Sequence, residues 1–304
     1  MDFWTPALEK RQVWRTLLGA IIVSACFFGA TFGVIFGGAL LLETTPEAII
    51  ETSGPREMAV FFLTFLGIYV GLALVVPLLH RRRFMSLFGP TSRVDVRHFG
   101  FGILVTAGIA TLLYLFQIGE QLVLPLEKRA GIDLLRPVGQ WAIWLLPALV
   151  LILMQSLAEE LFFRGYLLQQ LRARFRGMII CAVIPSFLFG MLHFDFATFG
   201  WVNGGAYVLS TTLSGVMACF ITLRTGNLGA VAGLHFGNNA SLVFLGIQGQ
   251  MDGFSLFGAV MAPQSGYTTY SMLLQTGLQV VAFFMWWRWM NKRNRLQTPP
   301  SSIR

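Results

Sequence analysis

The chain has 304 residues, of which 55% are hydrophobic and only 12% are charged, whereas about 25% charged residues is usual in soluble proteins. Its mean hydropathy is +0.67, too apolar for a soluble globule, and 28 Phe and 8 Trp exclude a disordered chain. The net charge of +8 does not indicate a nucleic-acid partner. The arginines cluster at the ends of apolar runs, as in the cytoplasmic loops of membrane proteins. The composition therefore predicts a protein embedded in the lipid bilayer.

Apolar runs long enough to cross a membrane recur along the chain. A hydrocarbon core about 30 Å thick requires about 20 helical residues. The runs cover approximately residues 13–42, 58–79, 99–118, 141–163, 177–194, 201–223, 228–247 and 267–290. We therefore expect an all-α fold, a polytopic bundle of about eight transmembrane helices.

Basic residues give this bundle an orientation. Lys10, Arg11 and Arg15 precede the first apolar run, and Lys292 and Arg293 follow the last one. Between them, loops rich in arginine alternate with loops that lack it. Because basic loops stay in the cytoplasm, we expect both termini there, in an integral protein of a bacterial inner (plasma) membrane.

The chain divides into three parts by its apolar runs and polar groups. Residues 1–140 hold the first three predicted helices and a cytoplasmic arginine loop. Residues 141–250 hold the next four helices, and residues 251–304 hold the last helix and a basic tail. The middle part carries the polar clusters that lie inside apolar runs.

Ionisable side chains inside a membrane-spanning segment are costly, at about 2.5 to 3.5 kcal/mol each on insertion scales. Each one therefore indicates a partner or a function. In this chain they concentrate near the ends of the fourth and fifth runs and in the seventh run. The ionisable residues are Glu159, Glu160, Arg164, His193 and His235, and the polar Asn239 accompanies them.

Spacing predicts how these side chains meet. Glu160 and Arg164 are four residues apart and can form an ion pair on one helix, and His235 and Asn239 share a helix face in the same way. If the helix after Glu160 continues to a turn near position 176, Glu159 and His193 are equally far from that turn. We therefore expect Glu159 to face the histidines while Glu160 pairs with Arg164.

This set of groups suits hydrolysis by a water molecule. A partly desolvated carboxylate beside an imidazole can take a proton from water as a general base. His235 and Asn239 are suitable donors to the oxyanion that then forms. No serine or cysteine stands beside a histidine as a nucleophile, so we expect no covalent intermediate and no required cofactor. The alternative is a zinc site formed by Glu159, His193 and His235, because two His and one Glu form a common catalytic zinc set.

Other polar or reactive residues fit structural roles. Cys26, Cys181 and Cys219 lie in apolar runs without metal-ligand spacing, which predicts core packing and no disulfide. His80 and His98 flank the arginine loop, and we expect both to be solvated.

Three short motifs occur in order in the middle part: Glu159-Glu160-x-x-x-Arg164, Phe189-x-x-x-His193 and His235-x-x-x-Asn239. With these motifs the chain resembles the CPBP or Abi family of intramembrane proteases. That family includes the type II CAAX prenyl endopeptidases and bacterial bacteriocin self-immunity proteins. The resemblance covers about residues 141–247.

The resemblance implies an eight-helix bundle with a cleft open to membrane and cytoplasm, and peptide-bond hydrolysis without a covalent intermediate. It implies that Glu159 activates water together with His193, that His235 and Asn239 stabilise the oxyanion, and that Glu160 and Arg164 support them. The expected partners are a membrane-associated peptide or protein substrate and the lipid bilayer. Prenyl specificity does not transfer with the motifs.

Non-enzymatic functions compete with this interpretation. The same glutamates and histidines could form a proton relay in a transporter. The chain could also be an immunity factor that only binds its target, or a scaffold that recruits other membrane proteins.

Overall fold

The computed structural model describes residues 2–52, 54–124 and 131–297. Here η1 and η2 are 3-10 helices, whereas η4 and η5 are π-helical. In chain order the elements are η1 Thr5–Ala7, α1 Val13–Leu41, α2 Pro46–Glu51, α3 Pro55–Leu63, α4 Leu66–His80, η2 Phe84–Phe88, α5 Val96–Val123, β1 Gly131–Leu134, α6 Val138–Glu160, η4 Leu161–Leu168, α7 Gln169–Arg174, η5 Ile179–Val183, α8 Ile184–Met191, α9 Phe196–Thr225, α10 Gly229–Ser241, β2 Leu245–Ile247, β3 Phe257–Val260 and α11 Gly266–Gln297.

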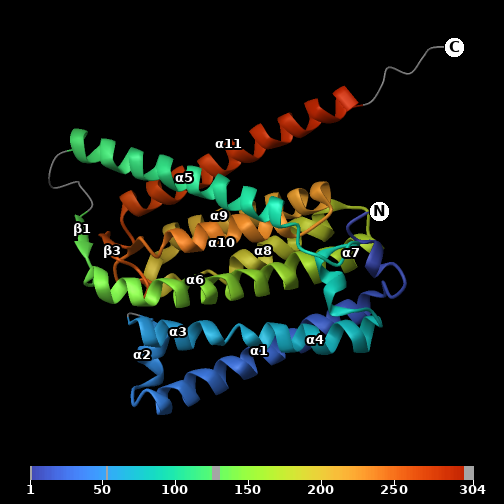
Figure 1. Cartoon of the computed structure of the whole chain (residues 1–304), viewed down its shortest axis with the longest axis horizontal. Coiled ribbons are helices and arrows are strands. Elements are labelled where there is room, and N and C mark those ends of the chain that lie inside the picture. The colour runs from blue at the N-terminus through green and yellow to red at the C-terminus, as the bar shows by residue number, and fades with distance from the viewer. Residues whose placement is uncertain (1, 53, 125–130, 298–304) are drawn as a thin grey trace.

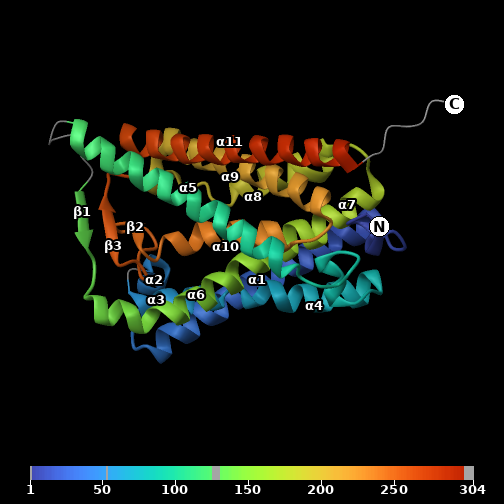
Figure 2. The ribbon, with the colours of Figure 1, turned by 45° about the horizontal axis from the view of Figure 1, so that its top comes forward.

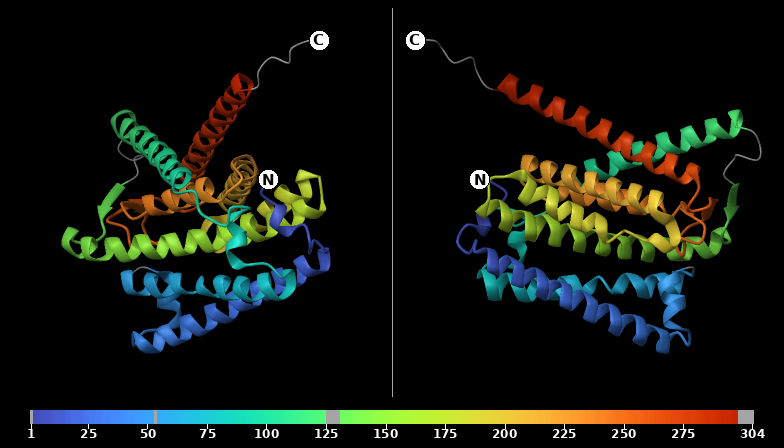
Figure 3. Two further views of the ribbon diagram at one scale, coloured as in Figure 1. Left: turned by 45° about the vertical axis from the view of Figure 1, so that its right-hand side comes forward. Right: turned by 180° about the vertical axis from the view of Figure 1, so that it is seen from behind.

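The helices form an elongated bundle with α1, α3 and α4 on one side and α5 and α11 on the opposite side (Figure 1). Between them lie α6, α8, α9 and α10, and α10 is enclosed by its neighbours when the bundle is tilted (Figure 2). The two outer helices α5 and α11 diverge from one another like the arms of a V (Figure 3). Helices fill the fold because the backbone hydrogen bonds of a helix are satisfied without water.

Helices lie at all the positions predicted from the apolar runs. Among the described residues, five helices are long and apolar enough to cross a membrane: Val13–Leu41, Pro55–His80, Val96–Val123, Val138–Arg174 and Phe196–Thr225. The apolar helix Ile179–Met191 is shorter than a full span. The helix of the fourth run continues past Phe163 to Arg174, consistent with the expected turn near position 176.

Local sequence signals set several of the helix boundaries. Asp95 caps α5 by accepting a hydrogen bond from the backbone N–H of His98 at 3.0 Å. Asp195 caps α9 in the same way with Thr198, also at 3.0 Å. Gly226 ends α9 with a φ of +73°, a conformation that glycine adopts at little cost.

The predicted seventh span, residues 228–247, is too long. Helix α10 ends at Ser241, and the chain then turns into β2, which pairs in parallel with β3. Strand β1 pairs with β3 in antiparallel orientation, with Gly131 opposite Val260. This small sheet was not predicted, because its strands are shorter than a residue pattern can identify and pair only through the tertiary fold.

Helices α5 and α10 approach one another very closely through glycines. A Cβ on Gly233 would lie 2.0 Å from the Phe99 carbonyl oxygen, and one on Gly237 would lie 2.1 Å from Thr106 Oγ1. Gly233 and Gly237 are four residues apart, the small-residue spacing that lets helix backbones pack in membranes. This contact fixes the rotation of α10 and leaves His235 and Asn239 to face α6.

Candidate functional site

The two adjacent carboxylates lie where α6 passes into the π-helical η4. Glu160 is 2% exposed, and its Oε1 accepts a hydrogen bond from Nη1 of Arg164 at 2.9 Å. Arg164 is itself buried within η4. This is the ion pair that the i to i+4 spacing predicts. A buried pair of this kind holds the turn after Glu159 in one arrangement, because either charge alone is strongly destabilising there.

His235 of α10 lies between the two carboxylates. Its Nδ1 is 2.9 Å from Oε1 of Glu160, and its Nε2 is 3.5 Å from Oε2 of Glu159. Glu160 therefore contacts Arg164 and His235 together, which the division of roles drawn from the sequence did not anticipate. A carboxylate on one ring nitrogen fixes the orientation of the imidazole and leaves the other nitrogen for chemistry.

His193 follows the end of α8 and is held separately. Its Nδ1 lies 2.9 Å from the carbonyl oxygen of Phe189. A carbonyl only accepts, so Nδ1 donates and Nε2 is left to accept a hydrogen bond. The imidazole ring packs against Phe189 and Tyr207, with centroids 4.8 and 5.5 Å away. The ion-pair partner of Glu159 in the structure is thus His235, not His193.

Asn239 is oriented by a chain of side-chain amides. Its Nδ2 donates to Oε1 of Gln155 at 2.9 Å, and its Oδ1 accepts from Nδ2 of Asn238 at 3.1 Å. Asn238 in turn accepts from Gln275 of α11 at 3.0 Å. These bonds fix which way the amide of Asn239 points. Its Nδ2 also has a long contact of 3.5 Å to Oγ of Ser156, weak enough for a second Nδ2 hydrogen to turn to a stronger acceptor.

One large cavity joins all of these groups. It has a volume of about 2190 Å³ and runs between α1, α5, α6, α8, α9, α10 and α11. Its lining includes every candidate residue taken from the sequence, namely Glu159, Glu160, Arg164, His193, His235 and Asn239. A cavity of this size has room for an extended peptide segment beside the polar groups.

The structure adds polar residues that sequence reasoning missed. Gln155 lines the same cavity and lies one helical turn before Glu159. Tyr207 also lines the cavity, and its phenol interacts electrostatically with Glu159. The i to i+4 spacing of Gln155 and Glu159 was a readable signal. Tyr207 had no such signal, because its neighbours in space come from other helices.

The described residues do not fit a metal site. They contain no group of three or more His, Cys, Asp and Glu side chains placed to hold one metal ion. Glu159 and His235 lie close together, but no third such side chain among the described residues is grouped with them. No chemical step is therefore assigned to a metal.

The histidines near the arginine loop differ from the expectation. His80 is buried, at 3% exposure, and its Nε2 lies 2.9 Å from the hydroxyl of Tyr166. The prediction that His80 is solvated is wrong, because α4 packs on η4 at that point and the N-terminal segment supplies the Lys10 carbonyl to Nδ1. His98 is partly exposed and pairs with Asp95. Cys26, Cys181 and Cys219 are free thiols, as predicted.

Comparison with known proteins finds a family match in the middle of the chain. Residues 140–241 match the family model described as type II CAAX prenyl endopeptidase Rce1-like. An uncharacterized protein of Bacillus subtilis (strain 168), YyaK, is 26% identical over 249 residues, which is 79% of this chain and 80% of that protein. No solved structure matches significantly. The chain is a polytopic α-helical membrane protein, and its residues 140–241 are similar to the Rce1-like type II CAAX prenyl endopeptidases.

Proposed function

We propose that this protein is an intramembrane endopeptidase that hydrolyses its substrate with a water molecule activated by Glu159. The family match supports a membrane peptidase. The observation that carries the mechanism is the position of His235, with one carboxylate at each ring nitrogen, on the wall of a cavity that His193 and Asn239 also line.

In the proposed reaction, water binds between the carboxylate of Glu159 and Nε2 of His193. Glu159 takes a proton from this water as the oxygen attacks the scissile carbonyl carbon. The carbonyl oxygen becomes an oxyanion, which accepts hydrogen bonds from Nε2–H of His235 and from the second Nδ2 hydrogen of Asn239. His235 acts here as an imidazolium with both ring nitrogens protonated, because its Nδ1 already donates to Glu160. Collapse of the tetrahedral intermediate breaks the C–N bond, and the proton on Glu159 passes to the leaving amine.

Supporting residues hold these groups in place. Glu160 and Arg164 form a buried pair that fixes the Nδ1 side of His235. Gln155 accepts one amide hydrogen of Asn239 and so directs the other. The substrate is a peptide segment of a membrane-associated protein, since the cavity lies among membrane-spanning helices.

We further propose that the protein resides in a bacterial inner membrane with both termini in the cytoplasm. Support comes from Arg15 of α1, Arg172 of α7 and Arg11, which bonds to the Ala173 carbonyl of α7. Helix α7 and the end of α11 lie at the same end of the bundle as the N-terminus (Figure 1). The positive-inside rule assigns such an end to the cytoplasm.

The test uses purified protein in liposomes with a library of membrane-derived peptides, read by mass spectrometry. We expect the wild type to cleave, Glu159→Ala and His235→Ala to lose cleavage, and a strong chelator to have no effect. Glu47→Ala, an exposed carboxylate of α2, is the matched control and should cleave normally. Full cleavage by Glu159→Ala, or no cleavage by the wild type, contradicts the proposal. Loss of cleavage with chelator that zinc restores contradicts its metal-free form.

A further inference from the structure

A second, smaller groove lies between α5 and α11, on the side of the bundle where these helices diverge (Figure 3). It has a volume of about 570 Å³, within the range of small-molecule sites. Five of its residues, Leu112, Leu115, Phe116, Val123 and Tyr270, are between 45 and 83% exposed, so the groove opens outward from the bundle. Its lining is Leu112, Leu115, Phe116, Gly119, Glu120, Val123, Leu124 and Tyr270.

Glu120 is the unusual member of this lining. The other groove residues of α5 are apolar, and Glu120 is the only Asp, Glu, Lys or Arg between Phe99 and Val123. An ionisable side chain on such a face is a functional candidate by default, because burial in lipid without a partner is costly. Among the residues that the structure describes, no Lys or Arg side chain pairs with Glu120.

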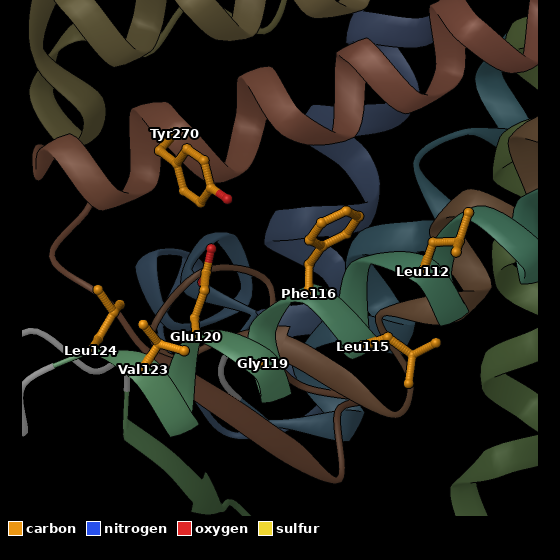
Figure 4. Close-up of a pocket in the computed structure, with 8 residues that line it drawn as sticks. All are labelled: Leu112, Leu115, Phe116, Gly119, Glu120, Val123, Leu124 and Tyr270. Carbon is orange, nitrogen blue, oxygen red and sulfur yellow. The ribbon is translucent and has the colours of Figure 1, made fainter.

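Two phenols of α11 turn toward this carboxylate. The hydroxyl of Tyr267 donates to Oε2 of Glu120 at 2.9 Å, and the phenol of Tyr270 also interacts with it. Figure 4 shows the hydroxyl of Tyr270 and the carboxylate of Glu120 pointing toward one another across the groove, with Phe116 beside them. A carboxylate has about four lone-pair sites, so Glu120 can accept from a further donor even while both phenols contact it.

The local charge favours a cation. Glu120 lies in the last turn of α5, where unpaired backbone carbonyls already give partial negative charge. Aromatic rings attract ammonium groups through their faces, and tyrosines are enriched where membranes meet water. One to two helical turns before Glu120 in α5, Leu112, Leu115 and Phe116 present an apolar surface suited to an acyl chain.

We propose that this groove binds a phospholipid whose headgroup carries a primary ammonium group. The ammonium lies between Glu120 and Tyr270, and an acyl chain lies along Leu112, Leu115 and Phe116. A primary ammonium has N–H groups that the carboxylate can accept, whereas a trimethylammonium group has none, and an anionic headgroup is repelled. The site is separate from the large cavity, and the inference does not depend on the proposed peptidase activity.

The test is native mass spectrometry of the full-length protein in a non-ionic detergent. Phosphatidylethanolamine, phosphatidylcholine and phosphatidylglycerol with identical acyl chains are added at equal concentration. We expect wild-type protein to retain phosphatidylethanolamine about tenfold better than phosphatidylcholine, as a hydrogen bond to a charged group provides. Glu120→Gln should reduce this ratio to near one. Glu47→Gln, which removes a carboxylate from exposed α2 at the same end of the bundle, should keep it.

A second variant tests the site independently, in case Glu120→Gln impairs folding. Tyr270 is 45% exposed, so Tyr270→Leu should preserve the fold and lower the phosphatidylethanolamine ratio through loss of the aromatic wall. Unchanged thermal unfolding confirms that each variant is folded. The proposal is overturned if the wild type retains both zwitterionic lipids equally, if Glu120→Gln keeps the preference, or if phosphatidylglycerol binds as well as phosphatidylethanolamine in a Glu120-dependent way.

Discussion

Nδ1 of His235 and Nη1 of Arg164 both lie 2.9 Å from the same oxygen, Oε1 of Glu160. Glu160 is therefore shared between a structural ion pair and the imidazole that faces the cavity. Glu159, one residue earlier, points to the other side of that imidazole. The two neighbouring carboxylates thus contact opposite sides of the imidazole, because the helix separates their directions by about 100°.

Substitution of the two glutamates should separate activity from stability. Glu159→Gln removes the proposed general base, and we expect a loss of about 10²- to 10⁴-fold in kcat with little change in the unfolding temperature. Glu160→Gln leaves Arg164 buried without its counter-ion, so the free energy of unfolding should fall by about 3 kcal/mol or more. Peptide cleavage and thermal unfolding in detergent measure the two effects. Equal destabilisation by both substitutions would contradict this division.

Gln155 should act as a positioning residue for Asn239. Gln155→Leu removes the acceptor that holds Nδ2, and we expect kcat to fall by about tenfold or more, since one oxyanion donor is misdirected, while KM stays near the wild-type value. Gln279→Leu is the matched control, because Gln279 lines the same cavity but accepts its hydrogen bond from Ser214, at 2.8 Å. A rise in KM with unchanged kcat would instead assign Gln155 to substrate binding.

The glycine contact between α5 and α10 should be essential for stability. Gly233→Ala places a Cβ where the Phe99 carbonyl now lies, and we expect the free energy of unfolding to fall by about 1 to 3 kcal/mol. Gly205→Ala in α9 meets nothing within 4 Å and should leave stability unchanged or slightly higher. Chemical unfolding monitored by circular dichroism distinguishes them. A neutral Gly233→Ala would show that the helices can separate freely.

The Asp195 cap of α9 predicts that the stability of the fold depends on pH. Hydrogen bonds from the side chain and backbone N–H of Thr198 lower the pKa of Asp195 below its usual value. A lowered pKa in the folded state adds stability that is present above the unfolded pKa, about 3.9, and is lost as pH falls through the folded pKa. Asp195→Asn keeps a cap but makes it neutral. Near neutral pH the wild type should therefore unfold at a higher temperature than Asp195→Asn, and this difference should disappear at acidic pH.

The measurement is the unfolding temperature of both proteins between about pH 3 and pH 7, a range that includes the pKa of about 3.9 of an unfolded Asp. Asp195→Ala removes the cap itself and should cost about 1 kcal/mol across the range. A difference between wild type and Asp195→Asn that grows as the pH falls would contradict the assignment.

The sequence by itself determined the membrane class, the all-α architecture and the positions of the helices. Each depends on a property that acts locally: a segment of about 20 apolar residues partitions into lipid as a helix whatever its neighbours are. The pairing of Glu160 with Arg164 was also readable, because the helical repeat brings residues four apart together. The order of the three motifs indicated the family, and the comparison confirmed it.

Contacts between helices were decided only by the tertiary structure. His235 reaches both glutamates because Gly233 and Gly237 let α10 approach α5 and so set its rotation. No spacing along the chain specifies that rotation. The same holds for the burial of His80 under Tyr166 and for the end of α10 at Ser241. Side chains far apart in sequence meet only after helices have packed, and packing depends on the shapes of complete surfaces.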